Sequence, residues 1–200
     1  MNGGSFISSV NGIRLAFCVV FGVLVVRSAW VADDAYITFR TIDNWAQGYG
    51  PVWNIAERVQ AYTHPLWMLM LSAAHVLTQD VYYTAIGLSL LASLATAGLL
   101  LRRVDGVRLW LVGLLLCTSK AFVDFSTSGL EDPLSHLLIV LSAFSLLHTS
   151  PSLAVFRRST FWVALAATCR LDLVILLGPA LLFQWYALPK QRSRWSALAI

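Results

Sequence analysis

The sequence has few charged residues and long stretches with none. Only 12% of its 200 residues are charged, 58% are hydrophobic, and the mean hydropathy is +0.72. Soluble domains carry about 25% charged residues, so this composition excludes an ordinary soluble domain. Long runs that are almost free of charge include 15–26, 109–116, 137–147 and 173–182. Bilayer hydrocarbon is the solvent that such runs require, and we therefore expect an integral membrane protein.

Cysteine is also scarce. Cys18, Cys117 and Cys169 all lie inside apolar runs, which argues against a disulfide framework or a zinc site. The net charge of +4 is modest, and the basic residues form short clusters between apolar runs instead of following one face. This pattern indicates membrane topology and argues against nucleic-acid binding. The sequence shows no internal repeat and no low-complexity linker.

The first apolar run could be a cleaved signal peptide or a retained membrane span. Cleavage after Ala32 would place Trp30 three residues before the cut, and cleavage after Ala29 would place Arg27 there. Neither fits the small-residue pattern of a cleavage site. We therefore predict a retained span over about residues 13–32, with its N-terminus in the cytoplasm.

The basic clusters predict how the chain crosses the membrane, because basic residues favour the cytoplasmic side. The clusters are Arg102, Arg103 and Arg108, then Arg157 and Arg158, then Lys190, Arg192 and Arg194. The loop 33–63 is then extracytoplasmic, and 81–101 is the return span. The apolar piece 64–77 is short for a span and predicts a re-entrant or interfacial helix.

The second half of the chain predicts further crossings. Residues 109–125 run outward, 126–132 form an external turn, and 133–149 return, with Pro133 in a first helical turn. The stretch 160–188 predicts a hairpin of two short helices, with Arg170 and Asp172 at its tip.

The predicted fold class is thus all-α. We expect one polytopic transmembrane helical bundle of about six membrane helices, including short or re-entrant ones, with a large first extracytoplasmic loop. Because Trp195–Ile200 resembles the start of another apolar segment, we expect residues 1–200 to form the N-terminal portion of a larger transmembrane domain.

Adjacent carboxylates begin the first loop, at Asp33 and Asp34. Two neighbouring carboxylates repel, which favours proton uptake by one of them and suits general-base chemistry near neutral pH. The simpler interpretation is that both acids cap a helix over 35–46. Arg40, about two turns along that helix, fits either a structural ion pair or a phosphate ligand.

The same loop is rich in aromatic residues, namely Tyr36, Trp45, Trp53, Tyr62 and Trp67. A membrane-interface belt is the favoured explanation for any single one of them. Aromatic faces also stack on sugar rings, so a carbohydrate site is the alternative.

Other polar residues extend the candidate site. His64 precedes Pro65, which predicts an interfacial imidazole that hydrogen-bonds locally or binds a substrate phosphate. The external turn 128–133 carries Glu131 and Asp132 on the same side of the membrane as Asp33, which suggests a shared site. Arg170 and Asp172 either pair with each other, or Arg170 holds a lipid phosphate.

Several motifs together resemble a known family. The run Asp33-Asp34-Ala-Tyr-Ile-Thr-Phe-Arg40 is followed by Val52-Trp53-Asn54, Glu57-Arg58-Val59 and Tyr62-Thr63-His64-Pro65-Leu66-Trp67. With Ser128-Gly129-Leu130-Glu131 and Arg170-Leu171-Asp172, they are similar to the mycobacterial terminal arabinofuranosyltransferases, which are GT-C membrane glycosyltransferases. The chain departs from that pattern at Thr41-Ile42-Asp43, at Ala61, where glycine is common, and at His64, where serine is common.

The resemblance implies an inverting sugar transfer at the outer side of the plasma membrane. It implies a polyprenyl-phosphate sugar, such as arabinofuranose, as donor and a cell-envelope glycan as acceptor. Asp33 or Asp34 would be the general base, supported by Glu131. The expected substrate-binding residues are Arg40, Trp53, Asn54, Glu57, Tyr62, His64, Arg170 and Asp172, with Arg40, His64 and Arg170 as candidates for the donor phosphate.

Two other functions remain open at this stage. A transporter or flippase of a polyprenyl-linked sugar would use Arg27, Arg170 and Asp172 to line a pathway, and a purely structural membrane subunit would use the acids as caps. No cofactor is required by the sequence. A divalent cation at the paired carboxylates is compatible with their oxygen ligands, although too few ligands are visible to predict it.

Overall fold

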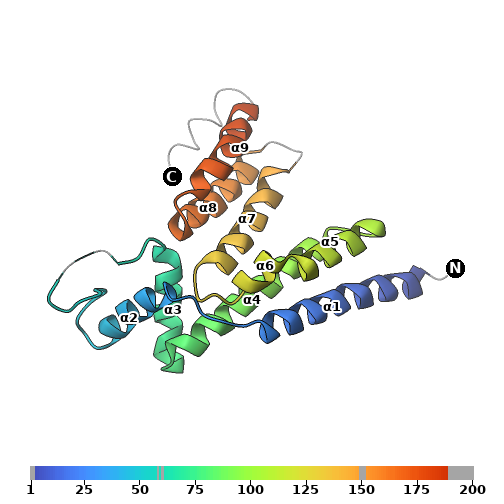
Figure 1. Ribbon diagram of the computed structural model, residues 1–200. Helices are drawn as coiled ribbons and strands as arrows, with labels where there is room; N and C mark the ends of the chain where they lie inside the picture. The colour runs from blue at the N-terminus through green and yellow to red at the C-terminus, as the bar shows by residue number, and fades with distance from the viewer. Residues whose placement is uncertain (1–2, 58, 60, 149–151, 189–200) are drawn as a thin grey trace.

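The computed structural model describes residues 3–57, 59, 61–148 and 152–188, and this part of the chain is helical and without strands (Figure 1). Its helices are α1 (Gly3–Arg27), α2 (Ala35–Ala46), α3 (Pro65–Thr78), α4 (Val81–Arg102), α5 (Val107–Thr118), α6 (Lys120–Phe125), α7 (Asp132–Leu146), α8 (Leu153–Cys169) and α9 (Leu173–Ala187). Arg58, the basic cluster at 190–194 and the segment Trp195–Ile200 lie outside the described residues.

The helices pack around two apolar cores. In the first, Phe21 and Val25 of α1 meet Leu101 of α4 and residues of α5 and α6. In the second, Phe39 of α2 and Trp67 of α3 meet residues of α7, α8 and α9. Helix α4 packs on both α1 and α7 and so joins the two groups, as Figure 1 shows.

Within the part of the chain that the structure describes, two helices are long and apolar enough to cross a membrane, over Val10–Arg27 and Val81–Arg102. Only 11% of the first of these segments is buried inside the protein, so most of its apolar surface faces outward. The second matches the predicted return span at 81–101. The predicted arrangement of about six membrane helices remains a prediction.

The end of the first predicted span was wrong. Helix α1 stops at Arg27 instead of residue 32, because the following backbone is bonded to another segment. The indole of Trp30 donates to the carbonyl of Asp124, and the amide of Ala32 donates to the carbonyl of Ser128. The Ala32 bond replaces the backbone bond that a continued helix would make, and the Trp30 side chain ties the segment to α6.

The predicted span 109–125 is divided in the structure. Ser119 is extended and separates α5 from α6, where Lys120 pairs with Asp124 one turn later. The predicted helix at 35–46 is confirmed by α2, and Pro133 lies in the first turn of α7, as expected. The predicted hairpin with Arg170 and Asp172 at its tip is confirmed by α8 and α9, which pack on each other.

Candidate functional site

The acidic pair lies at the start of α2. Asp33 and Asp34 form the turn that leads into the helix, and their backbone carbonyls accept from Tyr36 and Ile37. Both residues are exposed, and the Asp34 side chain makes no capping hydrogen bond. Among the described residues neither carboxylate has a side-chain partner. The capping interpretation therefore does not account for these side chains.

The backbone around the acidic pair is hydrogen-bonded to the second acidic turn, residues 128–133, which we call the second turn. Ala32 donates its amide to the carbonyl of Ser128 at 2.8 Å, immediately before Asp33. Gly129 has φ +77, and a Cβ there would lie 3.0 Å from the Cβ of Ala35. Trp67 of α3, buried, donates its indole N–H to the carbonyl of Gly129 at 3.0 Å. The structure thus brings the two acidic turns together.

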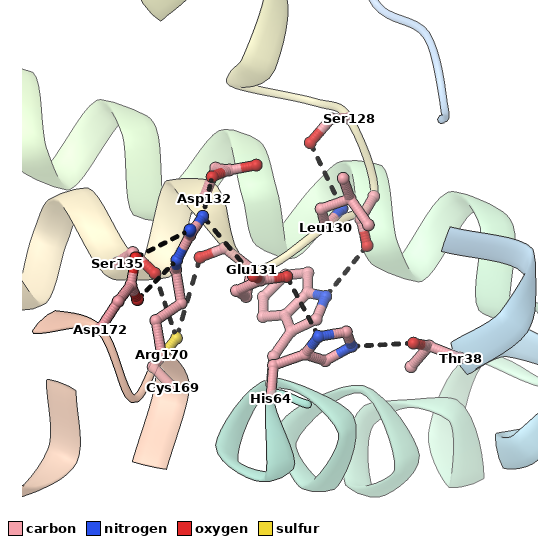
Figure 2. A network of polar contacts seen from close by, with 12 residues as sticks. Thr38, His64, Ser128, Leu130, Glu131, Asp132, Ser135, Cys169, Arg170 and Asp172 are labelled. Atoms are coloured by element: carbon pink, nitrogen blue, oxygen red, sulfur yellow. Dashed lines mark hydrogen bonds and ion pairs between the residues drawn. The ribbon is translucent and has the colours of Figure 1, made fainter. Parts of the chain in front are cut away.

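A buried hydrogen-bonded chain also links α2 with the second turn (Figure 2). His64 Nδ1 lies 3.1 Å from Glu131 Oε2, and His64 Nε2 lies 2.8 Å from Thr38 Oγ1. Since a carboxylate only accepts, the neutral imidazole donates from Nδ1 to Glu131 and accepts at Nε2 from the Thr38 hydroxyl. Neither ring nitrogen of His64 is left open for a phosphate.

The environment of His64 favours the neutral ring. Burial lowers the pKa of His64, and Arg170 acts in the same direction, while the charges of Glu131 and Asp132 oppose the shift. Burial is the largest of these effects, because an imidazolium loses its hydration when it leaves water. The chain Thr38–His64–Glu131 is therefore a neutral histidine held between a hydroxyl and a carboxylate.

Arg170 continues the network at the tip of the α8–α9 hairpin. Its guanidinium is bound by Asp172 at 3.0 and 3.2 Å and by Asp132 at 3.1 Å, and it lies 3.8 Å from Glu131 Oε1. These hydrogen bonds to Asp172 raise the pKa of Arg170 and lower that of Asp172. Figure 2 shows the guanidinium between the carboxylates. Arg170 and Asp172 therefore form the predicted ion pair, and the positive charge of Arg170 is already neutralised.

A second polar group forms on the outer side of α2. The guanidinium carbon of Arg40 lies 4.5 Å from the ring centroid of Trp53, and Arg40 Nη2 donates to Asn54 Oδ1 at 3.3 Å. Asn44 donates to the carbonyls of Val52 and Trp53 at 2.8 and 3.0 Å. The loop after α2 therefore folds back onto the helix. No carboxylate in the described part of the chain pairs with Arg40.

An open pocket of about 620 Å³ lies beside this group. Its lining residues are Ile37, Trp53, Glu57, Val59, Ala61, Tyr62 and Thr63. Ile37 and Arg40 follow Asp33 by four and seven positions, the spacing that places residues on one helix face. Asp33, the pocket and the cation therefore lie along the outer face of α2, with about 10 Å along the axis between Asp33 and Arg40.

The carboxylates of the two acidic turns are candidate metal ligands. Within the described ranges, no group of three or more His, Cys, Asp or Glu side chains is arranged to hold a metal ion. The carboxylates of Glu131, Asp132 and Asp172 are directed to His64 and Arg170.

Two curated proteins match the chain. Both are described as terminal beta-(1->2)-arabinofuranosyltransferase, one from Mycobacterium tuberculosis and one from Corynebacterium glutamicum. The chain resembles the terminal arabinofuranosyltransferases. It is 32% identical to the M. tuberculosis protein over 132 residues, which cover 60% of this chain and 21% of the relative.

The C. glutamicum arabinofuranosyltransferase is 31% identical over 119 residues, which cover 55% of this chain and 17% of the relative. The chain thus spans about a fifth of the length of the arabinofuranosyltransferases it matches. No family model and no solved structure matches the chain.

The predicted site residues fall into three places. The first is the network of His64, Glu131, Arg170 and Asp172, which is buried at His64 and exposed at Asp172. The second is the outer group of Arg40, Trp53 and Asn54, and the third is its pocket, which Glu57 and Tyr62 line. Asp33 and Asp34 stand beside them at the start of α2. Their roles in a reaction remain proposals.

Thr38 and Trp67 are polar partners that the sequence did not single out as site residues. Thr38 carries a hydroxyl on the buried face of α2, which it shares with Ala35 and Phe39. A hydroxyl among apolar residues at helical spacing is a signal for a buried hydrogen bond, but it does not name the partner.

Proposed function

We propose that the protein is a membrane glycosyltransferase that transfers a sugar from a polyprenyl-phosphate donor to a cell-envelope glycan. The observation that carries this proposal is the exposed pair Asp33 and Asp34 at the start of α2, whose carboxylates have no side-chain partner among the described residues. Asp33 lies on the same helix face as the cation Arg40. The resemblance to arabinofuranosyltransferases supports arabinofuranose as the sugar.

The reaction is a displacement at the anomeric carbon. Asp33 or Asp34 accepts the proton of an acceptor hydroxyl, and the hydroxyl oxygen forms a bond to the anomeric carbon. The bond between that carbon and the phosphate oxygen breaks on the opposite face, and the polyprenyl phosphate leaves with the electron pair. Configuration at the sugar is inverted in this single step.

Arg40 is the residue that we assign to the donor phosphate. Of the three predicted candidates, His64 has both ring nitrogens bonded, and Arg170 is surrounded by carboxylates. Among the described residues, the guanidinium of Arg40 contacts an aromatic ring and an amide oxygen and no carboxylate, so its charge is available to a phosphate. Its separation from Asp33 along α2 leaves room for the reacting carbon between base and phosphate.

We assign Glu131 a positioning role. Its carboxylate is 13% exposed and lies between His64 and Arg170, which keeps it from an acceptor hydroxyl. It joins α2, the second turn and the α8–α9 tip, and so fixes the backbone on both sides of the acidic pair. The location that we propose is the plasma membrane, with this site on its extracytoplasmic side and several membrane crossings.

The experiment is a transfer assay in membranes that contain the protein. Radiolabelled polyprenyl-phosphate arabinose or mannose is supplied with a glycan acceptor, and labelled product is counted for the parent, Asp33→Asn and Asp34→Asn. Loss of the general base lowers the rate by about 10²- to 10⁴-fold, so at least one variant is expected to lose this activity.

Asp43→Asn is the matched control, because Asp43 lies on the same helix but faces His75 of α3 at 3.8 Å. It is expected to retain transfer. Full activity in both Asp33→Asn and Asp34→Asn would contradict the proposal. Movement of the lipid-linked sugar across vesicles without a new glycosidic bond would favour a transporter instead.

A further inference from the structure

The open pocket beside α2 has a size and a lining that point to a ligand. Its volume of about 620 Å³ lies within the range of roughly 300–1,000 Å³ that is common for small-molecule sites. It is formed by Ile37 of α2 and by the loop that carries Trp53, Glu57, Tyr62 and Thr63. It is separate from the buried network around Glu131.

Trp53 is held in place before any ligand arrives. Its ring is covered by Arg40 at 4.5 Å, and its carbonyl accepts from Asn44 at 3.0 Å. The Trp53 residue is nevertheless only half-buried, and it borders the pocket. An aromatic side chain has few rotatable bonds, so a fixed ring offers contact area at a low entropic cost.

The polar groups of the pocket fit hydroxyl groups better than a phosphate. Among the described residues of the lining, Glu57 is the one with a charged side chain, and Thr63 supplies a hydroxyl. Both Glu57 and Thr63 are exposed. A carboxylate accepts hydrogen bonds from sugar hydroxyls and repels phosphate oxygens. A sugar ring has an apolar C–H face for Trp53 and a hydroxyl edge for Glu57.

We infer that this pocket binds a neutral sugar ring of the glycan acceptor, which stacks on Trp53 and donates hydroxyl hydrogen bonds to Glu57. The inference rests on the proposed function, since it assigns the acceptor to a place beside the acidic pair. Asp33 and Ile37 share one face of α2, so a ring in the pocket can present its next hydroxyl toward the proposed base. Arg40 then serves both sites, holding Trp53 and facing the donor phosphate.

The test measures binding of a soluble arabinofuranosyl oligosaccharide, without donor, by the detergent-solubilised protein in titration calorimetry. Trp53→Ala is expected to weaken binding by about tenfold or more, which is the scale of one lost aromatic contact. Trp53→Phe keeps a ring and is expected to retain most of the affinity. Glu57→Gln is expected to weaken binding less than Trp53→Ala does, by several-fold, because an amide still accepts hydrogen bonds.

Trp45→Ala is the matched control, because Trp45 is an exposed tryptophan of α2 that lines a different pocket, with Ala46 and His75. It is expected to bind as the parent does, and melting curves check that every variant is folded. A folded Trp53→Ala variant that binds normally, or a parent that binds no oligosaccharide, would overturn the inference.

The same assay separates this inference from the proposed function. Whichever of Asp33→Asn and Asp34→Asn loses transfer is expected still to bind the oligosaccharide normally, which supports both the inference and the proposed function. Transfer that depends on the aspartates but not on Trp53 would leave the reaction in place and remove the acceptor pocket.

Discussion

His64 is a buried histidine with a partner at each ring nitrogen. It is only 7% exposed, and its contacts to Glu131 and Thr38 are at 3.1 and 2.8 Å. The residues that face it with charge are Glu131, Asp132 and Arg170. Because burial lowers the pKa of His64 from its ordinary 6.5, the unfolded chain takes up a proton at a higher pH than the folded protein.

The stability of the protein is therefore expected to depend on His64 in weakly acidic solution. The contribution of the neutral ring is fully present above about pH 6.5 and is lost as the pH falls toward the lowered pKa. The melting temperature of the detergent-solubilised protein, measured from about pH 7.5 down to about pH 5.5, is expected to fall.

His64→Gln keeps a hydrogen-bonding side chain but has no titrating group, so its melting temperature is expected to change less across this range. His75→Gln on the same helix is the control and should keep the slope of the parent. An unchanged slope in His64→Gln would show that other groups cause the acid sensitivity.

At the scale of elements, the second turn contacts α2 through a glycine. Gly129 adopts φ +77, and a Cβ there would meet the Cβ of Ala35 and the Cγ1 of Val31 at 3.0 Å each. Both contacts are tighter than ordinary van der Waals distance, and Ala35 belongs to the buried core. The start of α2 and the turn before α7 can lie this close because residue 129 has no side chain.

Gly129→Ala is expected to destabilise the protein by about 2–4 kcal/mol, from backbone strain and overpacking together. Gly48→Ala is the matched control, because Gly48 has φ +87 but nothing within 4 Å of its would-be Cβ. Gly48→Ala is expected to destabilise the protein by about 1 kcal/mol, from backbone strain alone. Thermal melting of the two variants measures the difference, and equal losses would contradict a close approach at Gly129.

Local signals predicted several elements well. The acids before residue 35, Pro133 in a first turn, and the polar break at Arg170 and Asp172 each marked a helix boundary that the structure confirms. The end of α1 could not be predicted in this way. It depends on the hydrogen bond from the amide of Ala32 to the carbonyl of Ser128, almost a hundred residues further along the chain.

The candidate site shows the same division between local and distant information. The sequence identified Asp33, Glu131 and Arg170 as unusual charges near membrane segments. It could not show that His64 bridges Thr38 and Glu131, because that contact depends on how α2, α3 and the second turn pack. Three candidates for the donor phosphate were equivalent in sequence, and only their partners in the fold distinguish Arg40 from the other two.

At the scale of the whole molecule, the basic residues and the two long helices together indicate one orientation in the membrane. Arg14, near the start of the apolar segment Val10–Arg27 of α1, donates to Asp105 at 2.6 Å and to the carbonyl of Leu101 at the end of α4. The Arg14 end of the first candidate membrane helix therefore lies beside the end of the second, which carries Arg102 and Arg103. Because basic residues favour the cytoplasmic side, we propose that this end lies in the cytoplasm and that the start of α2 lies on the other side.

Labelling of single cysteines tests this orientation. In a variant with its native cysteines replaced by alanine, a cysteine at Gly48, beyond α2, is expected to react with a membrane-impermeant maleimide in intact cells. A cysteine at Asp105, between α4 and α5, is expected to react only after the membrane is permeabilised. Since Gly48 and Asp105 lie in exposed loops, accessibility to the reagent does not require unfolding. The reverse pattern would place the proposed acidic site in the cytoplasm and remove an extracytoplasmic glycan as its acceptor.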